Sequence, residues 1–322
     1  MRRLLLCLSM TIAAALPIVA SAQTFPSRPI RFIVPYPSGG PTDLMARALQ
    51  EPIQKAFGQP VVVENRAGAA GLIGTREAMR SAPDGHTLLF FNNGILSVTP
   101  FVVKDVGFDG MKDFAPVALA STAPLVIVTH PTVPVNDLRG FIDWARRQDP
   151  PIELSSSGIG SSGHLAGALF ARMAGIKTNH IPYKGQAPMT TALLAGEVRL
   201  VITSGSTAMN GFIASNKLKL LAVTSTEPTP LMPGAPTATS VLPGYVVEVF
   251  FGFLAPAGTP ADVITRLNEA FGRALETPEM RERFAGFGVR AAAATPRRLG
   301  EMIAEDITRW STVIRENNIR PE

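Results

Sequence analysis

The sequence repeats one local pattern that constrains its fold. A short apolar run of β-strand character stops at a turn of Gly, Ser or Asn, and a helical pattern follows at once. The clearest case is "IRFIV" at 30–34, followed by "PYPSGGPTD" and a helical pattern from about Thr42, in which apolar residues recur every four positions from Met45 to Phe57. Alternating strands and helices predict an α/β fold in which a mainly parallel sheet is flanked by helices.

The pattern continues along the chain in two series. "PVVVENRAGAAG" and "HTLLFFNNG" belong to the first, while "PIELSSSGIGSSGHLAG", "TNHIPYKG", "EVRLVITSGS" and "LKLLAVTS" form the second. After them "YVVEVFFGFLAPAGTP" returns to strand character, and helical patterns begin near Ala261 and Pro296. A length of 322 residues with 46% apolar composition favours two domains over one.

The first 22 residues have the features of a secretory signal peptide. Arg2 and Arg3 form a basic start, an apolar stretch runs from Leu4 to Leu16, and "ASA" ends at Ala22. The apolar stretch is shorter than the roughly 20 residues of a membrane span. We therefore expect cleavage after Ala22, export to the periplasm, and a mature protein that is not embedded in the membrane.

The mature chain lacks the residues of several common site types. The only cysteine, Cys7, lies within the signal segment, so no disulfide and no Cys-based metal site is expected. Loss of Arg2 and Arg3 lowers the formal net charge from +5 to +3, and the basic residues are scattered, so nucleic acid is not an expected partner.

Known catalytic and metal-binding motifs are also absent from the sequence. The chain has no Walker-type lysine, no H-E-x-x-H and no G-x-S-x-G motif. Its histidines have no metal-ligand spacing among them: His86, His130, His164 and His180. We therefore predict no catalytic residue, no metal and no cofactor.

The turns between strands and helices are candidates for holding an anion. They are Pro37–Thr42, Ala67–Gly71, Asn92–Gly94 and Ser155–Gly163. Backbone N–H groups at a helix start have no helical partner and can bind an anion without a cationic side chain. Helix capping explains any single turn. Several such turns in one α/β chain favour a ligand beyond the carboxyl ends of the strands.

One turn also allows a different function. "GIGSSG" at 158–163 follows a strand and matches the dinucleotide fingerprint G-x-G-x-x-G. The acidic residue that should end the next strand is missing, because that region reads "HIPYKGQ". A nucleotide-dependent α/β enzyme that uses this turn remains the alternative to a binding protein.

Several stretches together resemble the solute-binding proteins of tripartite tricarboxylate transporters, the Bug family. In order they are "YPSGGPTDLMAR", "GQPVVVENRAGAAG", "APDGHTLLF", "GSSGHLAG", "IPYKG", "LLAGEVRL" and "APAGTP". The resemblance implies a periplasmic-binding-protein-like fold of type II with a ligand cleft between two domains. Domain 1 would comprise residues 23–121 and 245–322, and domain 2 residues 122–244.

The resemblance also implies a function and a site. The protein would be a monomer without enzymatic activity that captures a small carboxylate, a di- or tricarboxylate or related organic acid, and delivers it to transporter membrane subunits. Backbone N–H groups, hydroxyls and waters would hold the ligand. The residues carried over are Tyr36, Ser38, Gly39, Gly40, Thr42, Asp43, Ala69, Ala70, Asn92, Ser156, Ser157, Gly158, Ser161, Ser162, His164, Thr203 and Ser204. Many relatives have an acidic residue near Thr203, whereas "ITSGS" has none.

Overall fold

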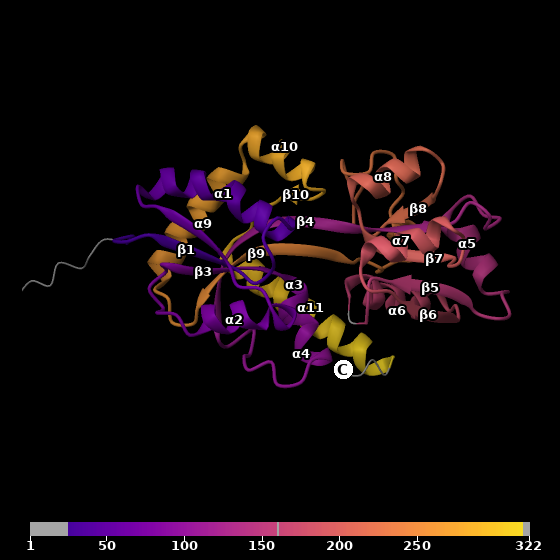
Figure 1. The fold of residues 1–322 in the computed structure, drawn as a ribbon, viewed down its shortest axis with the longest axis horizontal. Coiled ribbons are helices and arrows are strands. Elements are labelled where there is room, and N and C mark those ends of the chain that lie inside the picture. Colours follow the sequence, from indigo (N-terminus) through magenta and orange to yellow (C-terminus); the bar gives the residue numbers. More distant parts are fainter. Residues whose placement is uncertain (1–24, 160, 318–322) are drawn as a thin grey trace, which may run out of the picture.

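The computed structural model describes residues 25–159 and 161–317. The expected signal peptide and its cleavage after Ala22 lie outside the described residues. Two lobes lie side by side, and two long strands run between them (Figure 1). These are β4 (Phe114–Thr129) and β9 (Glu248–Pro256), which pair antiparallel.

The first lobe contains a sheet in the order β2-β1-β3-β9-β4. Its remaining strands are β1 (Ile30–Val34), β2 (Val61–Asn65), β3 (Thr87–Asn92) and the short β10 (Arg290–Ala291). Strand β1 runs parallel to β2 and β3, whereas β9 pairs antiparallel with β3 and β10 pairs antiparallel with β4.

The second lobe extends the same strand path. It contributes β5 (Ile152–Ser156), β6 (Thr178–Pro182), β7 (Leu200–Ser204) and β8 (Lys219–Val223). Strand β4 belongs to both sheets, because it pairs with β9 up to Pro124 and with β7 from Leu125. The division of the chain into 23–121 plus 245–322 and 122–244 remains a prediction.

Helices cover both faces of each sheet. Those of the first lobe are α1 (Pro41–Phe57), η1 (Ala69–Gly71), α2 (Leu72–Met79), α3 (Asn93–Ser97), α4 (Thr99–Val102), α9 (Ala261–Leu275) and α10 (Pro278–Gly286). Those of the second are α5 (Leu138–Ala145), α6 (Ser162–Ala174), α7 (Gln186–Leu194), α8 (Thr207–Ala214) and η2 (Ala238–Ser240), and α11 (Pro296–Glu316) closes the chain. None of the helices in the described part of the chain is long and apolar enough to cross a bilayer.

Alternation along the strands places a hydrophobic core on each face. In β1, Phe32 packs with the cluster under α1 and α9, while its neighbour Ile33 packs with the cluster under α2 and α11. In β4, Ile127 faces α5 and α6 and Val126 faces α7 and α8. Each fully buried side chain of this size stabilises the fold by about 1.5–3 kcal/mol.

The last helix joins the cores of both lobes. Leu299 and Ile303 pack with the cluster under α2, whereas Trp310, Val313 and Ile314 pack with the second-lobe cluster around α5 and α6. Because α11 contacts both lobes, it lies beside the two crossing strands as a third connection between them.

The α/β class predicted from the sequence is confirmed. The expectation of mainly parallel sheets holds only for β1–β3 and for β5–β7. Antiparallel pairs arise because β4 and β9 cross between the lobes in opposite directions. The sequence analysis did not identify β4 as a strand or α10 as a helix.

The start of α6 packs directly against β7 at a glycine. A Cβ atom on Gly163 would lie 2.3 Å from the carbonyl oxygen of Ile202, so no larger residue fits without moving the helix. Gly211 in α8 has open space around its Cβ position. These two glycines form a matched pair for measuring how tightly α6 is placed.

We predict that Gly163→Ala lowers the free energy of unfolding by about 1–3 kcal/mol, because the added methyl group overpacks a backbone contact. Gly211→Ala should be neutral or raise it by about 0.4–1 kcal/mol, because alanine restricts the unfolded chain. Urea denaturation followed by circular dichroism measures both. Equal stability of the two variants would show that α6 is not held by this contact.

Candidate functional site

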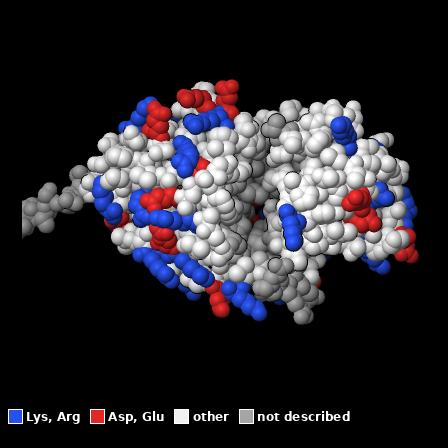
Figure 2. Space-filling model, in the orientation of Figure 1, with Lys and Arg blue, Asp and Glu red and all other residues white. Residues whose placement is uncertain are grey.

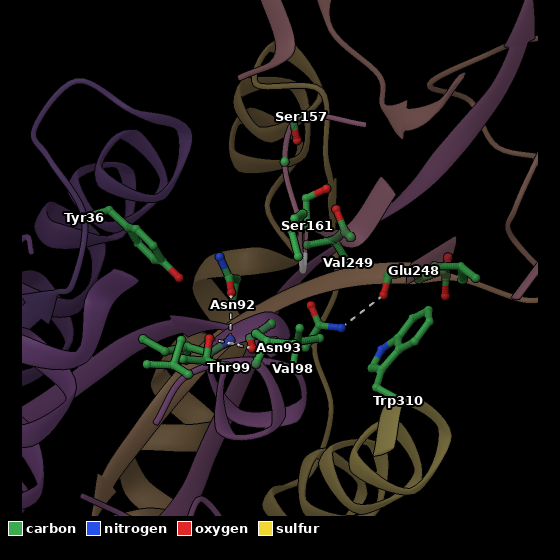
Figure 3. Close-up of a pocket in the computed structure, with 18 residues that line it drawn as sticks. Tyr36, Asn92, Asn93, Val98, Thr99, Ser157, Ser161, Glu248, Val249 and Trp310 are labelled. Atoms are coloured by element: carbon green, nitrogen blue, oxygen red, sulfur yellow. Dashed lines mark hydrogen bonds between the residues drawn. The ribbon is translucent and has the colours of Figure 1, made fainter. Parts of the chain in front are cut away.

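A cavity of about 460 Å³ lies between the two lobes. The space-filling view shows a hollow between the two lobes (Figure 2), and Figure 3 shows the cavity close up. Its size falls within the range of about 300–1,000 Å³ that is usual for small-molecule sites. It is lined by Tyr36, Asn92, Asn93, Gly94, Ile95, Val98, Thr99, Val102, Val103, Ser157, Gly158, Ile159, Ser161, Ser162, Val247, Glu248, Val249 and Trp310.

The first lobe contributes a tyrosine and an asparagine. Tyr36 follows β1, and Asn92 ends β3 and caps α3 by accepting a hydrogen bond from the Ile95 N–H at 3.3 Å. Burial raises the pKa of Tyr36 to about 12, and a side-chain interaction with Asn92 offsets only part of that rise. The phenol therefore keeps its proton at neutral pH and can donate a hydrogen bond.

The second lobe contributes the turn between β5 and α6. Gly158 has a φ of +141°, a conformation that glycine adopts without strain. Ser156 stabilises the turn, because its Oγ donates a hydrogen bond to the Gly158 carbonyl at 2.9 Å. Ser161 caps α6 by accepting from the His164 N–H at 3.3 Å. The positive end of the α6 dipole is thus at the cavity, together with the neighbouring serines.

Two histidines support this turn from behind. His164 stacks on His180 with ring centroids 3.8 Å apart and an interplanar angle of 5°. Burial lowers the pKa of His164 to about 4, helped by the charge of His180, and burial also lowers the pKa of His180. Both rings are therefore neutral at physiological pH, and neither lines the cavity as a cation.

A buried polar network forms the floor beneath the first-lobe side. The Asn93 Nδ2 donates to Asp306 Oδ2 at 2.8 Å, and its Oδ1 accepts from the Phe250 N–H at 3.2 Å. Ser97 Oγ also donates to Asp306. Burial raises the pKa of Asp306, although these hydrogen bonds partly counter it. The network ties α3, β9 and α11 together at the cavity.

Part of the cavity lining is apolar. Val98 and Val102 come from the α3–α4 segment, Val247 and Val249 from the start of β9, and Trp310 from α11. No Lys, Arg or His is among the described residues that line the cavity. An anion bound here would have to be held by neutral donors.

The structure brings some of the sequence-predicted site residues together. Those that line the cavity are Tyr36, Asn92, Ser157, Gly158, Ser161 and Ser162. Those that lie outside its lining are Ser38, Gly39, Gly40, Thr42 and Asp43 in the turn before α1, Ala69 in η1, Ser156 and His164 behind the second-lobe turn, and Thr203 and Ser204 at the end of β7. The side chain of Ala70 lies outside the described part of the structure. The part of these residues in ligand binding remains a prediction.

Sequence reasoning missed the apolar wall, Glu248 and Trp310. One signal was available for the floor, because Asp306 interrupts the apolar stripe of the last helix between Ile303 and Trp310. An acid at a core-facing position has to find a buried partner.

The turn before α1 is held by its own acid. The Gly39 N–H donates to Asp43 Oδ2 at 2.8 Å, so one donor of the predicted anion-binding turn is used within the protein. Arg47 Nε donates to Asp43 Oδ1 at 2.9 Å and Asn65 Nδ2 to the same oxygen at 3.0 Å. Burial raises the pKa of Asp43, but the hydrogen bonds outweigh it and the net shift is downward.

Comparisons with known proteins agree with one another, and they confirm the periplasmic-binding-protein fold predicted from the sequence. The family model "Tripartite tricarboxylate transporter family receptor" matches residues 45–319. Protein BugT of Bordetella pertussis is 36% identical over 323 residues, which cover 99% of both chains. A TctC solute-binding protein from Polaromonas, solved without ligand, has a TM-score of 0.82 at 28% identity, covering 91% of this chain and all of that one. Rpa4515 of R. palustris, solved with adipate, has a TM-score of 0.75 at 29% identity and covers 92% and 100%.

We predict that Asp43→Asn costs about 1.5–3 kcal/mol of stability at pH 7, because it weakens hydrogen bonds to a buried carboxylate. The folded-state pKa of Asp43 lies below the unfolded value of about 3.9, so this contribution is present above that pH and is lost as the pH falls. Denaturation between pH 3 and pH 7 should therefore show a smaller pH dependence in the variant. Asp143→Asn, at an exposed position, serves as the control; an equal effect there would contradict the assignment.

Proposed function

The chain belongs to the tripartite tricarboxylate transporter receptor family, and from this membership we propose that it captures a small carboxylate and delivers it to transporter membrane subunits. The family is one of solute-binding receptors of the periplasm, and the proposal extends that role to this chain. The observation that carries it is the cavity between the lobes, which has hydrogen-bond donors from both lobes and no cation among the described residues of its lining.

The grip that we propose uses neutral donors. The carboxylate would lie between Tyr36 and Asn92 on one side and Ser157, Ser161 and the N-terminus of α6 on the other. A helix N-terminus favours negative charge, and hydrogen bonds to a charged group each contribute about 1.5–3 kcal/mol. A ligand held from both sides favours the closed arrangement of the lobes, with the hinge at β4 and β9.

The domain division of 23–121 plus 245–322 against 122–244 fits this hinge. Strand β4 changes partner between Pro124 and Leu125, close to the expected boundary at 121 and 122. Closure of the two lobes around a ligand would then bend β4 and the start of β9. Export by the N-terminal signal peptide, with cleavage after Ala22, belongs to the same proposal.

The proposal includes no chemistry on the ligand. One Ser–His contact exists, since Ser156 Oγ lies 2.8 Å from His180 Nε2. Ser156 is fully buried beneath the turn and does not line the cavity, so this pair supports the fold of the turn. Among the described residues, no group of three or more His, Cys, Asp or Glu is placed to hold a metal ion.

We predict that at least one carboxylate stabilises the protein against heat, by about 2.7 kcal/mol at a hundredfold excess over its dissociation constant. A thermal-shift screen of mono-, di- and tricarboxylates tests this, with ATP and NAD as the comparison. Tyr36→Phe should weaken the binding of the best ligand by roughly ten- to a hundredfold, through the loss of one hydrogen bond to a charged group.

Tyr183→Phe, at a tyrosine outside the cavity lining, is the matched control and should leave affinity unchanged. Stabilisation by nucleotides alone would favour the enzyme that uses the 158–163 turn. A receptor function would also be contradicted if no carboxylate in the screen shifted the melting temperature.

A further inference from the structure

One acidic residue lines a cavity whose other lining residues carry no charge at neutral pH. Glu248 is the first residue of β9 and belongs to the lining together with Val247 and Val249. Its backbone is fixed, because Asn93 Nδ2 donates to the Glu248 carbonyl at 3.3 Å. Figure 3 shows Glu248 and Trp310 at one end of the cavity and Tyr36 at the other. The cavity thus has a donor-rich end and an acidic end.

The Glu248 carboxylate has no close partner in the described part of the protein. It makes no hydrogen bond or ion pair there, in contrast to Asp306, which accepts from Asn93 and Ser97. Burial raises the pKa of Glu248, against the attraction of Arg290 and Arg309.

Those two arginines make their hydrogen bonds elsewhere. Arg309 Nη1 donates to the Val246 carbonyl at 2.9 Å, and Arg290 Nη2 donates to Thr122 Oγ1 at 3.3 Å. Arg290 lies with Glu248 in the wall of a smaller neighbouring pocket and does not line the main cavity. Glu248 is therefore the charged residue among the described residues that line the cavity at this end.

A partly buried carboxylate that accepts no hydrogen bond from the protein favours ligands that carry a hydrogen-bond donor. When ionised it can only accept hydrogen bonds, so a ligand group with an N–H or O–H satisfies it. A second carboxylate on the ligand brings two like charges together in a site of reduced dielectric constant, where their repulsion lowers affinity by at least about tenfold. The apolar wall between the two ends suits a methylene chain or ring.

We propose that this cavity takes a monocarboxylate with an apolar body and a hydrogen-bond-donating ammonium group at its far end. This inference rests on the proposed function, because it assumes that the ligand carboxylate occupies the end with Tyr36 and Ser161. Glu248 is then the residue that sets specificity against dicarboxylates.

The test compares two series of ligands matched in length. Linear α,ω-dicarboxylates from four to eight carbons are measured beside ω-amino acids of the same chain lengths, by thermal shift and then by calorimetry at pH 7.5. In the wild type we expect the best ω-amino acid to bind at least about tenfold more tightly than the dicarboxylate of equal length.

Glu248→Gln should remove that preference, because the amide carries no charge and both donates and accepts. The ratio of the two affinities should fall by about tenfold or more, mainly through tighter dicarboxylate binding. Glu227→Gln is the control, since Glu227 is exposed and lines the small neighbouring pocket with Glu248 but not the main cavity. Circular dichroism and thermal unfolding without ligand verify that each variant is folded.

The outcomes separate this inference from the proposed function. If the wild type prefers the dicarboxylate, if Glu248→Gln leaves the ratio unchanged, or if no ω-amino acid binds while other carboxylates do, the inference is overturned and the receptor function stands. If no carboxylate of any kind binds the wild type or the variant, both fail.

Discussion

The antiparallel pair of β4 and β9 is the interaction on which the rest of the structure depends. Strand β4 pairs with β9 in the first lobe and with β7 and β8 in the second, so it is a member of both sheets. The cavity lies where the chain enters β9, and Val247, Glu248 and Val249 line it there. Helix α11 adds a third connection between the lobes, because it packs into a core of each.

Most ionisable side chains near the predicted ligand-binding turns are either paired within the protein or kept neutral by burial. Asp43 is engaged by Gly39, Arg47 and Asn65, and Asp306 by Asn93 and Ser97. Burial keeps the His164–His180 pair neutral by lowering the pKa of both rings. Among the described residues that line the cavity, neutral donors lie at one end and a single acidic residue, Glu248, at the other. This asymmetry is the basis of the proposed selectivity.

The local elements were predictable from the sequence, because their signals are local. The strand at 30–34, the helix that follows it and the turn at 155–163 each depend on residues within a few positions. The turns that carry Tyr36, Asn92 and the 157–162 segment were found for the same reason. Strand β4 was missed because both of its faces are buried for most of its length, so its sequence lacks the alternation that marks a half-exposed strand.

The far side of the site could not be predicted, because it depends on contacts between distant segments. Trp310 and Val98 line one cavity with Glu248 because β9 and α11 both pack against α3. A crystal structure with the tightest-binding carboxylate tests the central claim most directly. We predict that the ligand carboxylate accepts hydrogen bonds at about 3 Å from neutral donors of both lobes, among them Tyr36 and the 157–162 turn. A carboxylate held by an arginine or lysine, or bound outside this cavity, would contradict the account.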